Sequence, residues 1–372
     1  MPAAADPPRV AHLVVPAEVD DPAAPSGGNV YDVELARGLA AAGWELHRHR
    51  VPAGGPAAAR TGGLASCLAA LPAGSVVLVD GLLTVGAEDV VVGEAPRLRI
   101  VPLLHLPRSL AGGGPGVVDD ERRMLGAAAA VLTTSEWARR WLGERHPGLD
   151  TPVHAAAPGV HGSSLAPQSP AGRSLACVAA VVPAKGQDVL VRALARVRDL
   201  DWTCRLVGPL GRDPGFVGEV VRLVHEHDLD GRVRLTGAMP RAAVGAVLDA
   251  SDLLVHPTLR EVYGMVTTEA LARGVPVMAS DVGGVPEALG RAPSGAVPGL
   301  LVPPADPDAL ADALRSWLTD APLRDRLRRA ALERRDGLGG WAATAAAVAD
   351  VLRETAPRPP VNRTTPAAVV SG

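Results

Sequence analysis

Short apolar runs of strand length alternate with segments of helical length along most of this chain. Val, Leu and Ile fill the runs, and a turn and an Ala-, Leu- and Arg-rich segment follow. The predicted strands are Arg9–Val15, Val76–Val79, Leu98–Leu104, Ala130–Thr133, Leu175–Val182, Cys204–Val207, Val233–Thr236, Leu253–His256 and Val275–Ala279. Strands that alternate with helices in this way predict parallel sheets covered by helices on both faces.

The alternation stops once, over residues 162–172, where Ser, Pro and Gly dominate. We interpret this stretch as an interdomain linker, because 372 residues suit two domains better than one core. The sequence therefore predicts an α/β protein with two Rossmann-like, doubly wound domains, residues 1–165 and 166–337. Such sheets bind ligands at the carboxyl ends of their strands, so the cleft between the domains is the expected site. The Pro- and Ala-rich tail, residues 356–372, is predicted to be disordered.

Bulk properties exclude several classes of protein. A net charge of −3 argues against a nucleic-acid binder, and three widely spaced cysteines support neither a disulfide framework nor a zinc site. The N-terminus lacks the pattern of a signal peptide, and no apolar stretch reaches the length of a membrane span. We therefore expect a soluble, cytoplasmic protein.

Two glutamates, Glu261 and Glu269, stand among apolar residues after the strand that ends at His256. On one continuous helix, positions eight apart lie about 80° off one another and roughly 12 Å apart along the axis, so they are poor neighbours. The spacing makes better sense if Glu261 lies in a loop and Glu269 lies inside a helix that spans residues 264–273.

That helix would begin with three free amides, those of Gly264, Met265 and Val266, which offer a phosphate site. A carboxylate set a turn or more away, such as Glu269, could accept hydrogen bonds from a vicinal diol. The arrangement describes a nucleotide sugar, with the diphosphate at the helix end and hydroxyls on the acids. The alternative is that both glutamates lie on an exposed helix surface.

The surrounding sequence, "HPTLREVYGMVTTEALARGVPVMASDVGGVPE" from His256 to Glu287, resembles the signature of GT-B glycosyltransferases of the retaining family 4. Tyr263 stands where that family usually has Phe. Weaker likeness extends over most of the chain, including "PSGGNVYDVELARGLAAAGWEL", "VVPAKGQDVLVRAL" and "SGAVPGLLVPPADPDALADAL". The resemblance implies that the first domain holds the acceptor and the second the donor. It also implies that a helix within residues 338–355 crosses back onto the first domain.

The resemblance also implies the site residues. Glu261 would contact the hydroxyls of the donor sugar, Glu269 the ribose and Lys185 the leaving diphosphate, while His105 would lie near the sugar. The implied catalytic residues are His105, Lys185 and Glu261. The implied donor-binding residues are Gly27, Gly28, Lys185, Gly237, Glu261, Tyr263, Gly264, Met265, Val266 and Glu269. Glu287 is expected to complement the dipole of its own helix, with Gly283 and Gly284 at that helix start.

Two departures from the family pattern stand out. Ala180 occupies the position of an Arg that would bind the diphosphate, so another cation, such as Arg108 or Arg260, would have to replace it. His161 occupies a position where Asp or Asn is common, and we interpret it as structural.

The sequence thus predicts a retaining, metal-independent hexosyltransferase that uses a nucleoside-diphosphate sugar and no cofactor. The acceptor is a small molecule, a lipid or a polysaccharide precursor. Ala180 keeps open a catalytically impaired nucleotide-sugar-binding partner protein, and the fold keeps open a nucleotide-sugar 2-epimerase. A nicotinamide dehydrogenase is the weaker rival, because no Gly-x-Gly-x-x-Gly motif follows the glycine pair. A Trp- and Arg-rich segment, residues 137–145, leaves weak peripheral membrane contact as an alternative to inward packing of its tryptophans.

Overall fold

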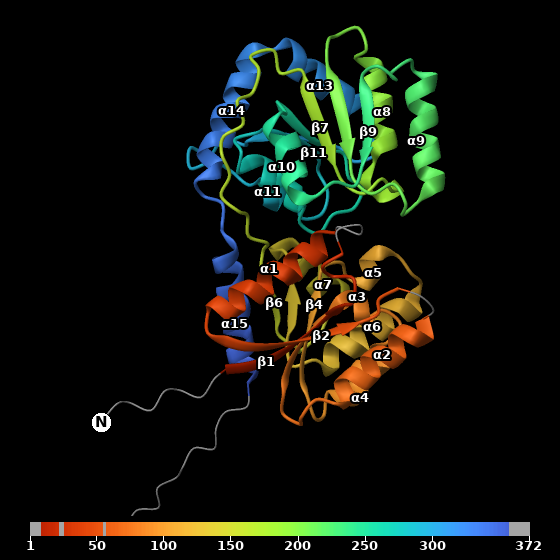
Figure 1. The fold of residues 1–372 in the computed structure, drawn as a ribbon, viewed down its shortest axis with the longest axis vertical. Helices are drawn as coiled ribbons and strands as arrows, with labels where there is room; N and C mark the ends of the chain where they lie inside the picture. The colour runs from red at the N-terminus through yellow and green to blue at the C-terminus, as the bar shows by residue number, and fades with distance from the viewer. Residues whose placement is uncertain (1–8, 22–25, 55–56, 357–372) are drawn as a thin grey trace, which may run out of the picture.

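The computed structural model describes residues 9–21, 26–54 and 57–356, so the predicted disordered tail lies outside it apart from Ala356. Within these ranges the chain forms two lobes, one above the other (Figure 1). Each lobe is built on a six-stranded sheet in which all paired strands run parallel. The predicted fold class is therefore confirmed.

The first sheet has the order β2-β1-β3-β4-β5-β6. Its strands are β1 (Arg9–Pro16), β2 (Trp44–Val51), β3 (Val76–Asp80), β4 (Arg99–Leu104), β5 (Val131–Thr133) and β6 (Val153–Ala155). The helices of this lobe are α1 (Gly27–Ala41), α2 (Ala57–Ala69), α3 (Gly81–Thr84), α4 (Glu88–Glu94), α5 (Arg108–Ala111), α6 (Pro115–Ala127) and α7 (Glu136–Arg145). One apolar core joins the sheet to α1, and a second joins its other face to α2, α4 and α6.

The second sheet has the order β12-β11-β10-β7-β8-β9. Its strands are β7 (Ser174–Val178), β8 (Thr203–Val207), β9 (Val233–Gly237), β10 (Leu253–His256), β11 (Val277–Ser280) and β12 (Gly299–Val302). After the 3-10 turn η1 (Pro183–Lys185), the helices are α8 (Gln187–Arg196), α9 (Pro214–Glu226), α10 (Arg241–Asp249), α11 (Met265–Leu271), α12 (Val285–Leu289), α13 (Pro307–Thr319) and α14 (Ala321–Arg335). None of the helices in the described ranges is long and apolar enough to span a membrane.

Three strands were not predicted: β2, β6 and β12. All three lie at the edge of a sheet, where strands need no continuous apolar run. Strand β2 shows the reason, because only its end residues Trp44 and Val51 are buried and its centre carries His, Arg and Glu. Periodicity therefore found the interior strands and one edge strand, β9, and missed the other three edges.

The last helix, α15 (Trp341–Thr355), runs down from the second lobe and lies beside α1 (Figure 1). Its apolar residues share one core with β1 and α1. Trp341, which is 7% exposed, meets the ring of Tyr31 edge-on at 5.6 Å between centroids. The C-terminal segment is thus part of the core of the first lobe.

We expect Trp341→Ala to destabilise the protein by about 3–5 kcal/mol, because it leaves a cavity in that core. Val221→Ala on α9 is the control, since Val221 is 51% exposed and its loss should cost less than about 0.5 kcal/mol. Urea unfolding followed by circular dichroism measures both. Equal midpoints for the two variants would show that α15 is not needed by the core.

Candidate donor site in the interdomain cleft

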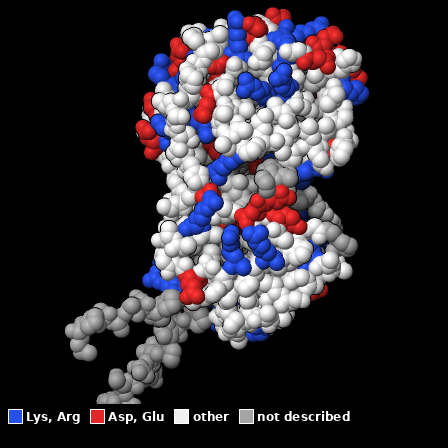
Figure 2. All heavy atoms as spheres, viewed as in Figure 1, with Lys and Arg blue, Asp and Glu red and all other residues white. Residues whose placement is uncertain are grey.

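A cavity of about 410 Å³ lies between the two lobes and is lined by residues from both. The lining segments follow the ends of parallel strands in each sheet, as expected for doubly wound folds. Charged side chains gather at the waist between the lobes (Figure 2). Of the predicted site residues, the cavity is lined by Gly27, Gly28, His105, Lys185, Glu261, Tyr263, Gly264, Met265, Val266 and Glu269.

Gly237 is the predicted site residue that does not line the cavity. It ends β9, and its carbonyl accepts a hydrogen bond at 3.0 Å from the amide of Gly208, which does line it. Lining residues that the sequence analysis did not single out include Ser26, Thr134, Arg212, Met239, Arg241 and Val244. They come from helix starts and loops far apart in sequence, so no local pattern marks them.

The loop after β10 is fixed by backbone contacts on two sides. The amide of Leu259 donates to the carbonyl of Ala184 at 2.8 Å, and the amide of Gly284 donates to that of Glu261 at 3.1 Å. Gly283 has a φ of +59°, and a Cβ there would lie 1.8 Å from the Glu261 carbonyl oxygen, so only glycine fits. The Gly283–Gly284 pair therefore supports the loop that carries Glu261.

Glu261 forms a compact charged contact with two residues of neighbouring elements. Its Oε2 lies 2.6 Å from Lys185 Nζ and 3.2 Å from His256 Nε2. Burial raises the pKa of Glu261, but Lys185 and His256 outweigh it, and the pKa lies at about 2. Glu261 is consequently ionised at neutral pH and only accepts hydrogen bonds.

Glu269 lies on α11, and Gly264, with a φ of +91°, precedes that helix. No side chain of the described residues caps this helix start. Arg241 Nη2 lies 3.7 Å from Glu269 Oε1. Burial raises the pKa of Glu269, and nearby cations led by Arg241 offset it in part. The structure thus separates loop and helix as the eight-residue spacing suggested, while the ligand roles stay predictions.

The glycine pair opens α1 rather than forming a loop before it. Ser26 caps this helix, and Gly27 and Gly28 are its first residues. A Cβ on Gly28 would meet the His105 ring at 3.0 Å, so the helix approaches this imidazole too closely for a side chain.

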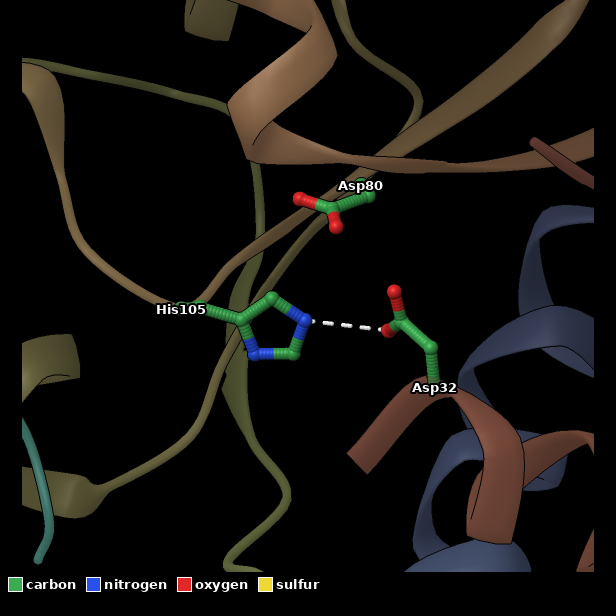
Figure 3. A group of neighbouring side chains, drawn as sticks. All are labelled: Asp32, Asp80 and His105. Carbon is green, nitrogen blue, oxygen red and sulfur yellow. Dashed lines mark hydrogen bonds and ion pairs between the residues drawn. The ribbon is translucent and has the colours of Figure 1, made fainter. Parts of the chain in front are cut away.

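His105 lies beside two buried carboxylates that the sequence analysis missed, Asp32 on α1 and Asp80 at the end of β3 (Figure 3). Nε2 of His105 is 3.0 Å from Asp32 Oδ1. Burial and the Asp32 charge raise the pKa of Asp80 to about 7. Asp80 directly follows the predicted run Val76–Val79 and could have been found there, whereas nothing local marks Asp32.

These three side chains could also hold a cation beside the cleft. One ligand atom from each of Asp32, Asp80 and His105 lies within 4.8 Å of the others. Asp32 Oδ2 has no hydrogen-bond partner among the described residues. Either a divalent cation or a proton shared by the two carboxyl groups would satisfy this geometry.

Comparison with known proteins agrees with this geometry. Residues 170–334 match the family model described as Glycosyl transferases group 1. A D-inositol 3-phosphate glycosyltransferase from Kineococcus radiotolerans is 35% identical over 219 residues, which are 56% of this chain and 50% of the relative. That of Corynebacterium glutamicum is 34% identical over 186 residues, or 48% and 43% of the two chains. The chain thus spans about half the length of the curated relatives it matches.

Solved structures share the fold over nearly the whole chain. Sucrose-phosphate synthase from Thermosynechococcus elongatus has a TM-score of 0.76 at 23% identity, covering 93% of this chain and 98% of its own. Anabaena HepE in complex with UDP-glucose has a TM-score of 0.75 at 16% identity, covering 93% and 99%. The chain has the GT-B fold, and residues 170–334, called the group 1 domain below, are the part that matches the group 1 glycosyl transferase model.

The group 1 domain contacts the first lobe through Glu287, in a way that the sequence analysis did not foresee. The Glu287 carboxylate accepts hydrogen bonds from the amides of Glu136 at 2.9 Å and Trp137 at 2.8 Å, which open α7 of the other lobe. The expectation that Glu287 complements only its own helix is therefore wrong in one respect: the helix whose free amides it satisfies is α7.

The inward packing suggested for the tryptophans of residues 137–145 is seen in part. Trp141 is partly buried against the core of the first lobe, and the ring of Trp137 stacks on it at 6.2 Å. Arg139 and Arg140 are exposed. Membrane contact stays a prediction.

A second contact between the lobes centres on Glu34, which is buried on α1. Its Oε1 lies 3.1 Å from His161 Nε2 and 3.3 Å from Arg241 Nη1 of the group 1 domain. His161 thus has the structural contact that we expected, with Glu34 as its partner.

The sequence analysis expected Arg108 or Arg260 to replace the Arg that is missing at Ala180. Arg108 pairs with Glu88, and Arg260 donates to a backbone carbonyl of the first lobe. Neither lines the cavity, whereas Arg212, in the loop after β8, does.

The charge state of His105 predicts a pH dependence of stability. Burial lowers the pKa of His105, but Asp32 and Asp80 outweigh it and raise that pKa to about 9. The folded protein therefore holds this proton more tightly than the unfolded chain, whose imidazole titrates near about 6.5. The stabilisation is complete below about pH 6.5 and is lost as the pH rises through about 9.

We expect Tm to fall between about pH 7.5 and 9, above the Asp80 titration, and to fall less steeply in Asp32→Asn, where His105 loses its main partner. His225→Gln is the control, because this imidazole is 83% exposed, and it should keep the wild-type slope. Differential scanning fluorimetry across the pH series measures Tm. An unchanged slope in Asp32→Asn would contradict the assignment.

Proposed function

We propose that this chain is a retaining glycosyltransferase of family 4 type that moves a sugar from a nucleoside-diphosphate sugar to an acceptor hydroxyl. The observation that carries the proposal is the meeting of Lys185, Glu261 and Glu269 in one cavity at the strand ends of the group 1 domain. A structure of this fold was solved with UDP-glucose, which supports a nucleoside-diphosphate donor.

The charges along the cavity suggest the orientation of the donor. Lys185 and the uncapped start of α11 favour the diphosphate. Glu269, further along α11, would accept hydrogen bonds from the ribose diol. Glu261, ionised by its low pKa, would accept them from hydroxyls of the transferred sugar. In this orientation Lys185 exchanges part of its contact with Glu261 for a diphosphate oxygen.

The reaction then needs no covalent nucleophile from the protein. The acceptor hydroxyl attacks the anomeric carbon from the face that the diphosphate leaves, the bond to the diphosphate breaks, and a diphosphate oxygen takes the hydroxyl proton. The chain contributes positioning, water exclusion and positive charge. His105 contributes to this positive charge, because its pKa of about 9 keeps the ring protonated at neutral pH. Its Nδ1 lies on the ring edge turned away from both carboxylates (Figure 3).

Beyond the co-substrate, the proposal uses no cofactor. The acceptor would bind on the first lobe, beside His105 and Thr134. Because the relatives carry the name D-inositol 3-phosphate glycosyltransferase, that polyol is the first acceptor to screen, followed by lipid and polysaccharide precursors.

We expect UDP-glucose to raise Tm of the wild type, and Glu269→Ala to weaken binding by at least about tenfold, because two charged hydrogen bonds of about 1.5–3 kcal/mol each are lost. Thermal shift and isothermal titration calorimetry measure the binding. Glu219→Ala is the matched control, a helical glutamate on α9 whose partner is Arg192 at 3.7 Å. Equal affinity in Glu269→Ala and Glu219→Ala would remove Glu269 from the site.

Product analysis separates the remaining alternatives. Transfer or slow hydrolysis of the donor, with the sugar unchanged at C2, supports the transferase. Inversion at C2 would identify an epimerase. Donor binding without turnover in any acceptor screen would identify the impaired binding partner that Ala180 keeps open.

Arg212 is proposed to supply the positive charge that Ala180 lacks. We expect Arg212→Gln to lower the affinity for UDP by at least about fivefold and Arg212→Lys to retain most of it, because the contact is one of charge. Arg222→Gln, on the exposed side of α9 beside Glu226, is the control. If UDP titrations give the same affinity for all three variants, another group balances the diphosphate.

A further inference from the structure

Three histidines lie on one face of the first sheet, away from the cleft cavity. The edge strand β2 carries Glu45, His47 and His49 at alternate positions, so they point to the same side. Strand β1 pairs with β2 in parallel, and the register sets His12 beside His47. The three imidazoles therefore share one surface, although they come from segments more than thirty residues apart in sequence.

Ring nitrogens of two of these histidines, His12 and His49, already face each other, and the ring of His47 lies beside that of His12. His12 Nδ1 lies 3.0 Å from His49 Nε2, and the His12 ring is 5.2 Å from both neighbouring ring centroids. Two imidazole nitrogens at this distance need a proton or a cation between them. Nitrogens bound to one tetrahedral zinc ion lie about 3.3 Å apart, which is close to the spacing seen here.

The charges around the cluster favour a cation. Glu45 Oε1 lies 3.2 Å from His47 Nε2 and provides the negative charge. Arg48 and Arg50 occupy the intervening positions of β2 and point to the other face. Burial and the neighbouring imidazoles lower the pKa of His12 and of His49.

We propose that His12, His47 and His49 form a binding site for a divalent transition-metal ion, of which Zn²⁺ and Ni²⁺ are the best fits, with Glu45 as a further ligand. Imidazole is a preferred ligand of these ions, and two histidines two positions apart on a strand, with a third on the adjacent strand, can bind one ion from three sides. The His47 side chain is 47% exposed and turns from Glu45 toward the other two rings when the ion binds. The site is separate from the proposed transfer reaction, because none of its residues lines the cleft cavity.

Binding here would tie the edge strand to its neighbour. A ligand that binds only the folded protein stabilises it by an amount that grows with the logarithm of its concentration above Kd. The proposed consequence is a first lobe whose stability rises with zinc, independently of any nucleotide in the cleft.

The test uses the full chain without an affinity tag, stripped with EDTA and titrated with ZnCl₂, NiCl₂ or MgCl₂. We expect about one equivalent of Zn²⁺ or Ni²⁺ by calorimetry, a rise in Tm, and no effect of Mg²⁺, which prefers oxygen ligands. His47→Gln/His49→Gln should weaken Zn²⁺ binding by at least about tenfold and abolish the rise in Tm. His47→Gln alone, at an exposed ring, should give a partial loss and leave folding unchanged.

The matched control is His225→Gln/His227→Gln. These histidines have the same spacing in sequence, but they lie at the end of α9, where residues two apart do not face each other. This variant should bind Zn²⁺ like the wild type. Equal binding by His47→Gln/His49→Gln and the wild type would overturn the proposal. Loss of zinc in Asp80→Asn, with retention in His47→Gln/His49→Gln, would overturn it too and place the ion at the Asp32–Asp80–His105 group.

Discussion

The arrangement of the cleft depends on the clamping of one loop, the segment between β10 and α11. It is tied by its backbone to the turn before α8 on one side and to the turn before α12 on the other. Because these turns belong to different crossovers of the same sheet, the clamp brings Glu261 against Lys185, 76 residues away in sequence. The ion pair holds its geometry because the backbone beneath it cannot shift without breaking both sets of contacts.

Contacts between residues distant in sequence also join the two lobes. Glu287 satisfies the free amides of α7, and Glu34 is shared by His161 and Arg241. These contacts are polar and can exchange with water, unlike the apolar core that joins α15 to α1. A cleft held by such contacts, beside a covalent and apolar connection at one side, suits the proposed function, in which the site would admit a nucleotide sugar and then exclude water.

Much of this architecture was predictable, and the failures have a common cause. Short apolar runs located the buried strands, because burial on both faces of a sheet leaves a continuous apolar run. Helical spacing of apolar residues located the main helices. The edge strand β2 escaped, since its His, Arg and Glu residues face solvent. The spacing of Glu261 and Glu269 placed one in a loop and the other in a helix. Asp32, Arg212 and the partner of Glu287 were beyond reach, because segments distant in sequence bring each of them to its place.

The sequence by itself determined the α/β class and the presence of two Rossmann-like domains, and it predicted residues for a nucleotide-sugar site, because these depend on local periodicity and on motifs within one segment. Only the tertiary structure decided which charges face one another. Asp32 meets His105, Arg212 rather than Arg108 or Arg260 lines the cavity, and His12 lies beside His47 and His49 on the first sheet. Hydrogen bonds and close ion pairs require their partners within a few ångströms, so they are set by strand order and register, which no local pattern encodes.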